Sequence, residues 1–308
     1  MWRSFYRVMP RRSDHRVFSQ PGATCVAKGV APTTKESSTR TAEIYEAYHT
    51  VLSAVRSFAR ARTIEEVLPS PTASEFEFSP ERTYFLGDPQ DPDLMLPASN
   101  TLQKQVACGL LGSIFCVAPC FRREPPDRSP QTTLHVFHQI EVELSGADAV
   151  TARATALSLL RHITSSFPSA DRCRKQLSRI AVIDILRQPG VPPSFETYDQ
   201  WLERHYDPTA AAWVIHLPQN PHLAINRPMA GTNLAEAFEL LLPDEYGEIL
   251  SGGARDPGTA RRLWQRAGQD PSLGPKPSSG FGIGLERLVA WLMGCRDLSE
   301  IRLPHFNA

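Results

Sequence analysis

The stretch LHVFHQIEVEL, residues 134–144, alternates between two kinds of side chain. One set is apolar apart from a single histidine: Val136, His138, Ile140 and Val142. The other set carries most of the polar groups: Phe137, Gln139, Glu141 and Glu143. Because successive side chains of a strand point to opposite faces, the pattern predicts a β-strand with one face in the core. The face with the two glutamates is either a solvated sheet surface or the floor of a site.

A second apolar strand, SIFCVAPCFRRE (113–124), is predicted before a proline-rich loop that leads to residue 134. If this strand pairs with the 134–144 strand, Arg122 and Glu124 at its C-terminal end lie beside the polar face of that strand. Together they form a surface of mixed charge.

The rest of the chain alternates short strands with amphipathic helices. We expect helices over 41–62, 99–112, 148–166 and 255–268, strands over 64–71 and 211–218, and a strand–turn–strand over 238–255. With few βαβ units, this order predicts an α+β fold whose antiparallel sheet is flanked by helices.

The composition argues against several classes of function. Thirty-three Lys and Arg balance thirty-three Asp and Glu, so the net charge is zero, which argues against a surface specialised for nucleic-acid phosphates. The chain is 41% hydrophobic and has no run of eighteen apolar residues, which predicts a globular protein that does not span a membrane. The six cysteines show no paired CxxC spacing, so reduced core thiols are favoured over a structural zinc.

Residues 1–41 differ from the rest, because they are rich in arginine and poor in acids. They are predicted to be a basic N-terminal arm or a targeting segment, and 42–308 a single catalytic domain. We expect a cytoplasmic protein, with a mitochondrial location as the alternative that the Arg-rich segment raises.

In SSGFGIGLERLVAWLMGC (278–295), a glycine-rich strand is predicted to run into a helix that begins at Glu286 and Arg287. Gly280, Gly282 and Gly284 would let a flat ligand lie against the backbone, and a helix N-terminus favours an anion. Arg287 could present a guanidinium fork to a phosphate.

These segments resemble the signature motifs of class II aminoacyl-tRNA synthetases, in the aspartyl/asparaginyl/lysyl subgroup. IEEVLPSP is similar to motif 1, CFRRE with VFHQIEVE to motif 2, and GFGIGLERLVAWLMG to motif 3. LPASNTLQKQ and GEILSGGAR are similar to two further segments of that family, and the resemblance covers about residues 42–306. It implies a class II synthetase-like antiparallel sheet, flanked by helices and dimerised through motif 1.

The chemistry implied is the activation of an amino acid by ATP and Mg²⁺ as an acyl-adenylate. By motif, Arg122 would bind the α-phosphate, Glu124 and Phe137 the adenine, and Arg287 the outer phosphates. Ser251, Gly284 and Arg128 would complete the nucleotide site. Glu248 would hold the metal, with Glu239 and Glu141 as candidate helpers.

On the amino-acid side, Lys104 and Arg255 match the cations with which aspartate-specific members read a carboxylate, and two cations favour aspartate. Glu75, Ser99 and Gln139 match other substrate-lining positions. GEILSGGAR, however, is closer to the asparaginyl branch.

The group that accepts the activated amino acid is inferred from the residues that precede the catalytic region. About forty residues come before it, too few for the anticodon-binding barrel of the family's tRNA ligases. The sequence therefore favours transfer of the activated aspartate to ammonia or a small amine, as in free-standing asparagine synthetase-like relatives. A reduced, perhaps organellar, aspartyl- or asparaginyl-tRNA ligase and a non-catalytic paralogue are the alternatives. His216, His222 and His305 are candidate bases for the acceptor, or structural residues.

Overall fold

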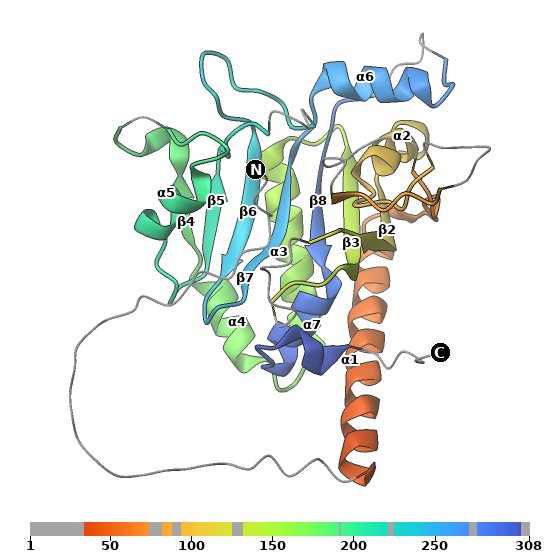
Figure 1. The fold of residues 1–308 in the computed structure, drawn as a ribbon, viewed down its shortest axis with the longest axis vertical. Coiled ribbons are helices and arrows are strands. Elements are labelled where there is room, and N and C mark those ends of the chain that lie inside the picture. The colour runs from red at the N-terminus through yellow and green to blue at the C-terminus, as the bar shows by residue number, and fades with distance from the viewer. Residues whose placement is uncertain are drawn as a thin grey trace.

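The computed structural model describes residues 34–73, 82–87, 94–124, 132–190, 192–220, 225–270 and 276–302, with side chains from Thr39 onward. One sheet holds all of its named strands: β1 Glu65–Glu66, β2 Ile114–Phe121, β3 Val136–Ser145, β4 Ala181–Asp184, β5 Ala212–Ile215, β6 Ala237–Leu242, β7 Gly247–Ala254 and β8 Ser278–Gly284. Their order is β1-β2-β3-β8-β7-β6-β5-β4 (Figure 1).

The pairing from β2 across to β5 is antiparallel, which confirms the predicted α+β sheet. The two edges differ from the prediction, because β1 is parallel to β2 and β4 is parallel to β5. Both edge strands are short and are reached by long connections, as parallel pairing requires.

Helices α1 Thr34–Arg60, α2 Thr101–Leu111, α3 Ala149–Ser165, α4 Asp171–Ser178, α5 Tyr198–His205, α6 Pro257–Arg266 and α7 Leu285–Met293 surround the sheet, with short 3-10 turns η2 Ile185–Arg187 and η3 Leu298–Ile301. Local capping fixes two of their starts: Asp148 accepts from the Thr151 amide at α3, and Asp256 from the Thr259 amide at α6, each at 2.7 Å. None of the described helices is long and apolar enough to cross a membrane.

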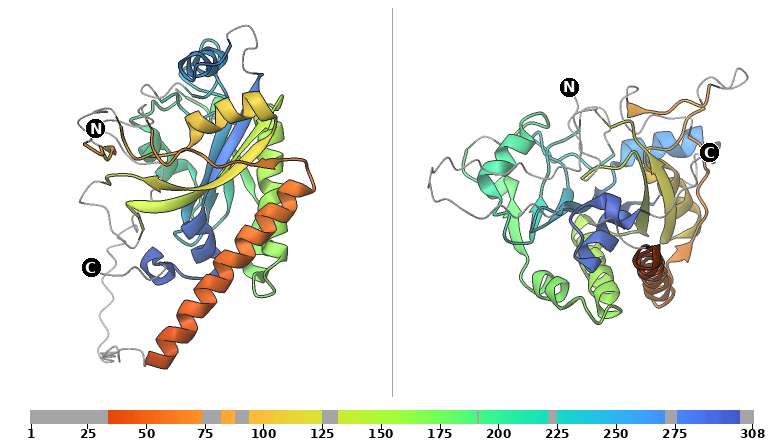
Figure 2. Two further views of the ribbon diagram at one scale, coloured as in Figure 1. Left: turned by 90° about the vertical axis from the view of Figure 1, so that its right-hand side faces the viewer. Right: turned by 60° about the horizontal axis from the view of Figure 1, so that its bottom comes forward.

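One face of the sheet carries the main core. Helix α3 packs against β6, β7 and β8, with α1 and α7 beside it (Figures 1 and 2). Ile140 and Val142 of β3 point into this core, as the alternation predicts. Val136 and His138 do not: both are exposed where the strand begins.

The opposite face of the sheet is buried rather than solvated. Gln139, Glu141 and Glu143 are each at most 5% exposed. Helix α2 covers them at one side, through Lys104, and α5 packs Trp201 and Leu202 over the β5–β6 side in a second, smaller apolar cluster.

The pairing of β6 with β7 contains a bulge. Glu239 pairs with Ser251 and Leu240 with Leu250, but Leu241 pairs with Glu248, so Ile249 is an extra residue. Three positions separate Glu248 from Ser251, which would put them on opposite faces of a regular strand. The bulge brings Glu248 to the face that carries Ser251 and Glu239.

The predicted arm, residues 1–41, lies largely outside the described residues, and α1 begins at Thr34. Its role stays a prediction. The five described cysteines are all buried and form no disulfide with one another.

Candidate active site

Two hollows on the polar face of the sheet are lined by many of the predicted site residues, whereas Glu239 and Glu248 line neither. The larger, about 750 Å³, is lined among others by Ser99, Lys104, Arg122, Gln139, Ser251 and Arg255. The smaller, about 340 Å³, is lined among others by Glu124, Phe137, Gly284 and Arg287. They meet at β3, where the Arg122 guanidinium carbon lies 4.9 Å from the centre of the Phe137 ring.

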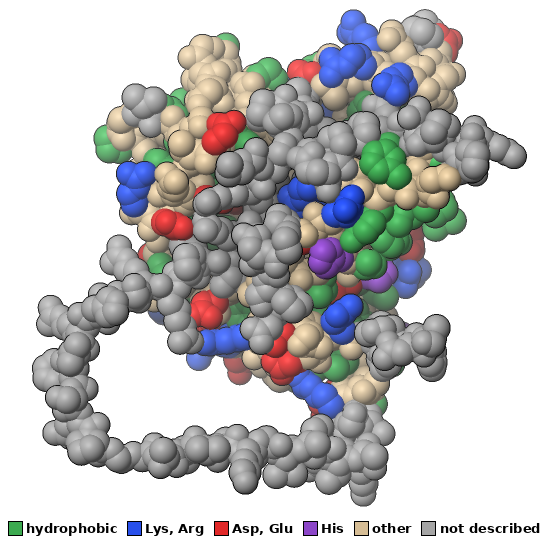
Figure 3. Space-filling view, in the orientation of Figure 1, with side chains coloured by type: hydrophobic (Ala, Val, Ile, Leu, Met, Phe, Trp, Pro, Cys, Tyr) green, Lys and Arg blue, Asp and Glu red, His purple; other side chains and the backbone are tan. Residues whose placement is uncertain are grey.

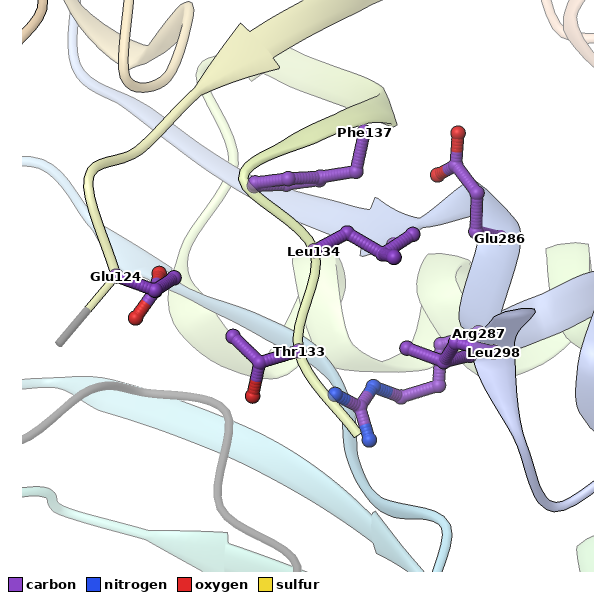
Figure 4. A pocket seen from close by; sticks show the side chains of 8 residues that line it. Glu124, Thr133, Leu134, Phe137, Glu286, Arg287 and Leu298 are labelled. Carbon is purple, nitrogen blue, oxygen red and sulfur yellow. The ribbon is translucent and has the colours of Figure 1, made fainter. Parts of the chain in front are cut away.

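The smaller hollow has the shape expected for a flat ligand. Figure 4 shows the Phe137 ring and Leu134 on one side and the Arg287 guanidinium, which extends toward Thr133, on the other. Gly284 contributes no side chain, so the wall beside α7 is backbone. The aromatic ring, backbone wall and cation suit a nucleobase that carries phosphates.

Both predicted phosphate-binding arginines are buried and held by backbone carbonyls. Arg287, 6% exposed, donates to the carbonyls of Tyr246 at 2.6 Å and Thr132 at 2.9 Å. Arg122 donates through Nε to the Ala98 carbonyl at 2.9 Å. These hydrogen bonds to backbone carbonyls fix the orientation of the two guanidinium groups.

Glu248 lies in the field of both arginines. Burial and the nearby charge of Glu239 raise its pKa well above the ordinary value, while a hydrogen bond from Ser251 and the charges of Arg287 and Arg122 oppose that rise. Its Oε1 is buried and has no hydrogen-bond partner in the described part of the chain. A buried oxygen of this kind is usually satisfied by ordered water or by a bound ion.

Glu239 and Glu248 form a buried carboxylate pair. Burial raises the pKa of Glu239 to about 7, and the Tyr198 hydroxyl donates to its Oε1. Two adjacent carboxylates with a free oxygen fit a divalent cation whose other ligands are phosphate oxygens.

Glu141, predicted as a third ligand, does not join that pair, because it is bound to the Lys104 ammonium. Among the described residues no group of three or more His, Cys, Asp or Glu could hold a metal by itself.

The amino-acid end of the larger hollow contains two buried ion pairs. The Lys104 ammonium pairs with Glu141, and the Arg255 guanidinium binds Glu143 at 2.8–3.1 Å. Burial alone would raise the pKa of Glu143, but Arg255, Lys104 and the Ser278 hydroxyl together hold it below the ordinary value. Each of the two cations that the sequence assigns to the substrate is thus already paired with a protein carboxylate, and their contact with a substrate stays a prediction.

The glycines of β8 have a second role beside ligand access. A Cβ on Gly280 would lie 2.0 Å from Glu143 Oε2, and one on Gly282 would lie 3.1 Å from Glu141 Oε2. In the register, Gly280 and Gly282 face those same glutamates on β3. Glycine leaves room for the two carboxylates, while Gly284 borders the nucleotide hollow as predicted.

Several residues that support the site could not be recognised from the sequence. Arg82 pairs with Glu124 at 2.5 Å with both side chains buried, and Asn226 accepts from Arg255 at 3.2 Å. Tyr198 lies in a stretch without a recognisable motif. For Glu143, the alternation of residues 134–144 indicated only that it lies on the polar face of the strand. Glu124 is thus held at the nucleotide hollow by a partner 42 residues earlier in the chain.

Some predicted residues are not placed in the site. Glu75, Arg128, His222 and His305 lie outside the described residues. His216 bonds through Nδ1 to Asp184 at 2.6 Å and does not line either hollow, which favours its structural role. Ser99 lies at the predicted place and approaches Glu141 at 3.4 Å.

A histidine latch joins β3 to α7 at the rim of the nucleotide hollow. Glu286 accepts from the His138 amide and its Nδ1, each at 2.8 Å, and this raises the pKa of His138. A raised folded pKa means that the stabilisation is complete below the unfolded pKa, near 6.5, and is lost as the pH rises through the folded value.

We therefore expect the Tm of His138→Asn to depend less on pH than the wild-type Tm between the unfolded and folded pKa values of His138. The loss of Tm should be largest at the acidic end of that range. Thermal unfolding at a series of pH values measures this. His162→Asn is the matched control, because that ring bonds the Ser57 hydroxyl and no carboxylate. Equal pH profiles for wild type and His138→Asn would contradict the prediction.

Comparison with known proteins agrees with this geometry. A family model for tRNA synthetases class II (D, K and N) matches residues 34–305. The asparagine–tRNA ligase of Pelotomaculum thermopropionicum is 23% identical over 252 residues, which is 67% of this chain and 55% of that protein. The enzyme of the same name from Herpetosiphon aurantiacus is 26% identical over 257 residues, 66% of this chain and 56% of that protein. The chain spans about half the length of these curated relatives.

Solved structures share the fold. Asparaginyl-tRNA synthetase from Pyrococcus horikoshii, complexed with asparaginyl-adenylate, superposes with a TM-score of 0.69 at 20% identity, covering 86% of this chain and 68% of that one. The Entamoeba histolytica enzyme in complex with asparaginyl-adenylate gives 0.65 at 18% identity, covering 86% and 67%. The family match spans most of the chain, and the fold agrees. The chain belongs to the class II tRNA synthetases of the D, K and N group.

Proposed function

We propose that this chain activates an amino acid with ATP, forming an aminoacyl-adenylate and pyrophosphate. The observation that carries the proposal is that two buried arginines from distant segments, Arg122 and Arg287, both act by charge on the buried Glu248. Arg287 lines the nucleotide hollow, and Arg122 lines the hollow that contains Lys104 and Arg255.

The attacking group needs no general base, because a substrate carboxylate is already ionised at neutral pH. What the reaction requires is positioning and stabilisation of phosphate charge. Phe137 and the Gly284 backbone hold the adenine, Arg122 contacts the α-phosphate, and Arg287 the outer phosphates. Glu248 and Glu239 would hold Mg²⁺, which supplies further neutralisation of the phosphates when it is bound.

The amino acid that the pocket fits best is asparagine. Lys104 and Arg255 are balanced by Glu141 and Glu143, so these four side chains carry no net charge before a substrate enters. A third carboxylate, from aspartate, would leave an uncompensated buried negative charge, which is costly. A neutral amide adds no charge and can accept from a cation while it donates to a glutamate. The ligand named in both similar solved structures is asparaginyl-adenylate.

The acceptor that the comparisons favour is tRNA rather than ammonia. Both curated relatives are tRNA ligases, and nothing in them supports an ammonia-dependent reaction. Transfer of the activated amino acid to tRNA is therefore the function we propose, in place of the amide-forming reaction that the sequence favoured. Homodimer assembly and location in the cell stay predictions.

Amino-acid-dependent ATP–pyrophosphate exchange tests the proposal. With a panel of amino acids, exchange with asparagine is expected to exceed that with aspartate by at least about tenfold, since even 1.4 kcal/mol of pocket discrimination gives that factor. Lys104→Ala should raise the KM for the amino acid by about 10- to 100-fold, with a far smaller change for ATP.

Three outcomes would count against this reading. Faster exchange with aspartate would overturn the asparagine assignment. Absence of exchange with every amino acid would favour a non-catalytic paralogue. Labelled amino acid that reaches ammonia but not tRNA, after normal exchange, would overturn the acceptor.

A further inference from the structure

A third hollow, about 720 Å³, opens beside the amino-acid pocket. The two share three lining residues, Leu217, Asn220 and Asn226. At its other side the third hollow is bordered by Asp256 and by two residues of α6, Thr259 and Arg262. It thus extends from the amino-acid pocket to helix α6, and the activation chemistry described above does not use it.

Helix α6 concentrates positive charge on its outer side. Arg261, Arg262 and Arg266 are exposed, Pro257–Arg266 contains no acidic residue, and Lys276 is exposed a little further along the chain. Figure 3 shows Lys and Arg side chains gathered over this helix. The whole chain has zero net charge, so this is a local excess of the kind that attracts a polyanion.

The helix is a rigid support for these charges. Its inner side buries Ala260, Leu263 and Trp264. The Trp264 ring lies so close to α2 that a Cβ on Gly109 would be 2.4 Å from it, and its Nε1 donates to the Asp270 carbonyl at 2.8 Å. Arg262 donates to the Thr259 hydroxyl at 2.9 Å, which ties its guanidinium to the hollow.

We propose that α6 binds the phosphates of the terminal nucleotides of an RNA acceptor strand, and that the third hollow receives its last nucleotide. This inference rests on the proposed transfer to tRNA and adds where the RNA docks. Three arginines on one helical surface complement consecutive phosphates, and the hollow beneath them leads to the pocket that holds the amino acid. The zero net charge that argued against nucleic-acid binding thus conceals a local basic surface.

The test is a triple variant of the full chain, Arg261→Gln/Arg262→Gln/Arg266→Gln. Binding of an RNA hairpin with a single-stranded 3′ end is measured by fluorescence anisotropy over a range of KCl concentrations. We expect Kd to rise by at least about tenfold at low salt. The slope of log Kd against log salt should fall by about 2, because each lost phosphate contact contributes about 0.7 for a single strand.

The matched control removes three other exposed cations, with Lys175→Gln, Arg179→Gln and Arg204→Gln in one chain. It should bind the hairpin as the wild type does. A hairpin with a blunt end should bind more weakly than the single-stranded one and lose little affinity in the α6 variant. Exchange by the α6 variant should equal that of the wild type, and its Tm should be similar.

The outcomes separate this inference from the function on which it rests. Unchanged RNA binding by the α6 variant, an equal loss in the control variant, or an equal loss for blunt and single-stranded hairpins would overturn the docking surface. Wild-type protein that shows no exchange would overturn the proposed function instead.

Discussion

Replacing Arg287 by alanine is expected to lower ATP–pyrophosphate exchange by about 10²- to 10³-fold, the usual loss when one group that stabilises developing charge is removed. The Arg287 guanidinium is buried, it donates to two backbone carbonyls, and its charge acts on Glu248. Exchange measured at saturating amino acid and varied ATP reports the loss directly.

Arg172→Ala is the matched control for that experiment. Arg172 also donates to a backbone carbonyl, that of Trp291 at 2.6 Å, and its guanidinium lies 5.3 Å from the centre of the Tyr246 ring. It lines neither of the two hollows of the active site. A similar loss of Tm in both variants with loss of exchange only in Arg287→Ala is the expected pattern. Near-normal exchange by folded Arg287→Ala would remove the basis of the proposed function.

Arg255→Ala should produce the largest loss of stability, about 3–5 kcal/mol in the free energy of unfolding, because it leaves Glu143 buried without its main partner. Glu143 is 0% exposed, and among the described residues it would retain the Ser278 hydroxyl and a distant Lys104 ammonium, 3.8 Å away. Urea unfolding monitored by circular dichroism measures the change.

The exposed pair Arg56–Glu66 provides the comparison. Its two side chains are hydrogen-bonded at 2.9–3.1 Å, yet both are about half exposed. Arg56→Ala is expected to cost at most about 1 kcal/mol. Equal losses in the free energy of unfolding for Arg56→Ala and Arg255→Ala would show that burial of the Arg255–Glu143 pair adds nothing to stability.

The pH dependence follows from the same pair. The folded pKa of Glu143 is depressed, so its contribution to stability is present above the unfolded pKa, near 4.5, and is lost as the pH falls through the folded value. The Arg255→Ala variant should lose less stability on acidification than the wild type does.

Local sequence patterns were enough to predict most of the strands and helices that position the site. The alternation in residues 134–144 predicted β3 and its polar face, and the step from glycines to Glu286 and Arg287 predicted the junction of β8 and α7. In each case the signal lies within a few residues, because side-chain direction in a strand and the start of a helix are local properties.

What the sequence could not show depends on contacts between distant segments. Arg255 meets Glu143 across 112 residues, and Tyr198 meets Glu239 across 41. The expectation of aspartate counted two cations without the two carboxylates that the sheet brings to them. The parallel edge strands were missed because β1 and β4 are too short for periodicity to reveal their direction.

The extra residue at Ile249 makes the placement of Glu248 sensitive to chain length rather than to residue type. Side-chain direction in an extended segment depends on an odd or even count, so deleting one amino acid there would turn Glu248 toward the apolar layer beneath the sheet. Every side chain of the proposed site would still be encoded, yet the carboxylate would face α3 instead of the polar face of the sheet. In this region a gap of one position in an aligned homologue therefore signals lost activity more strongly than many substitutions would.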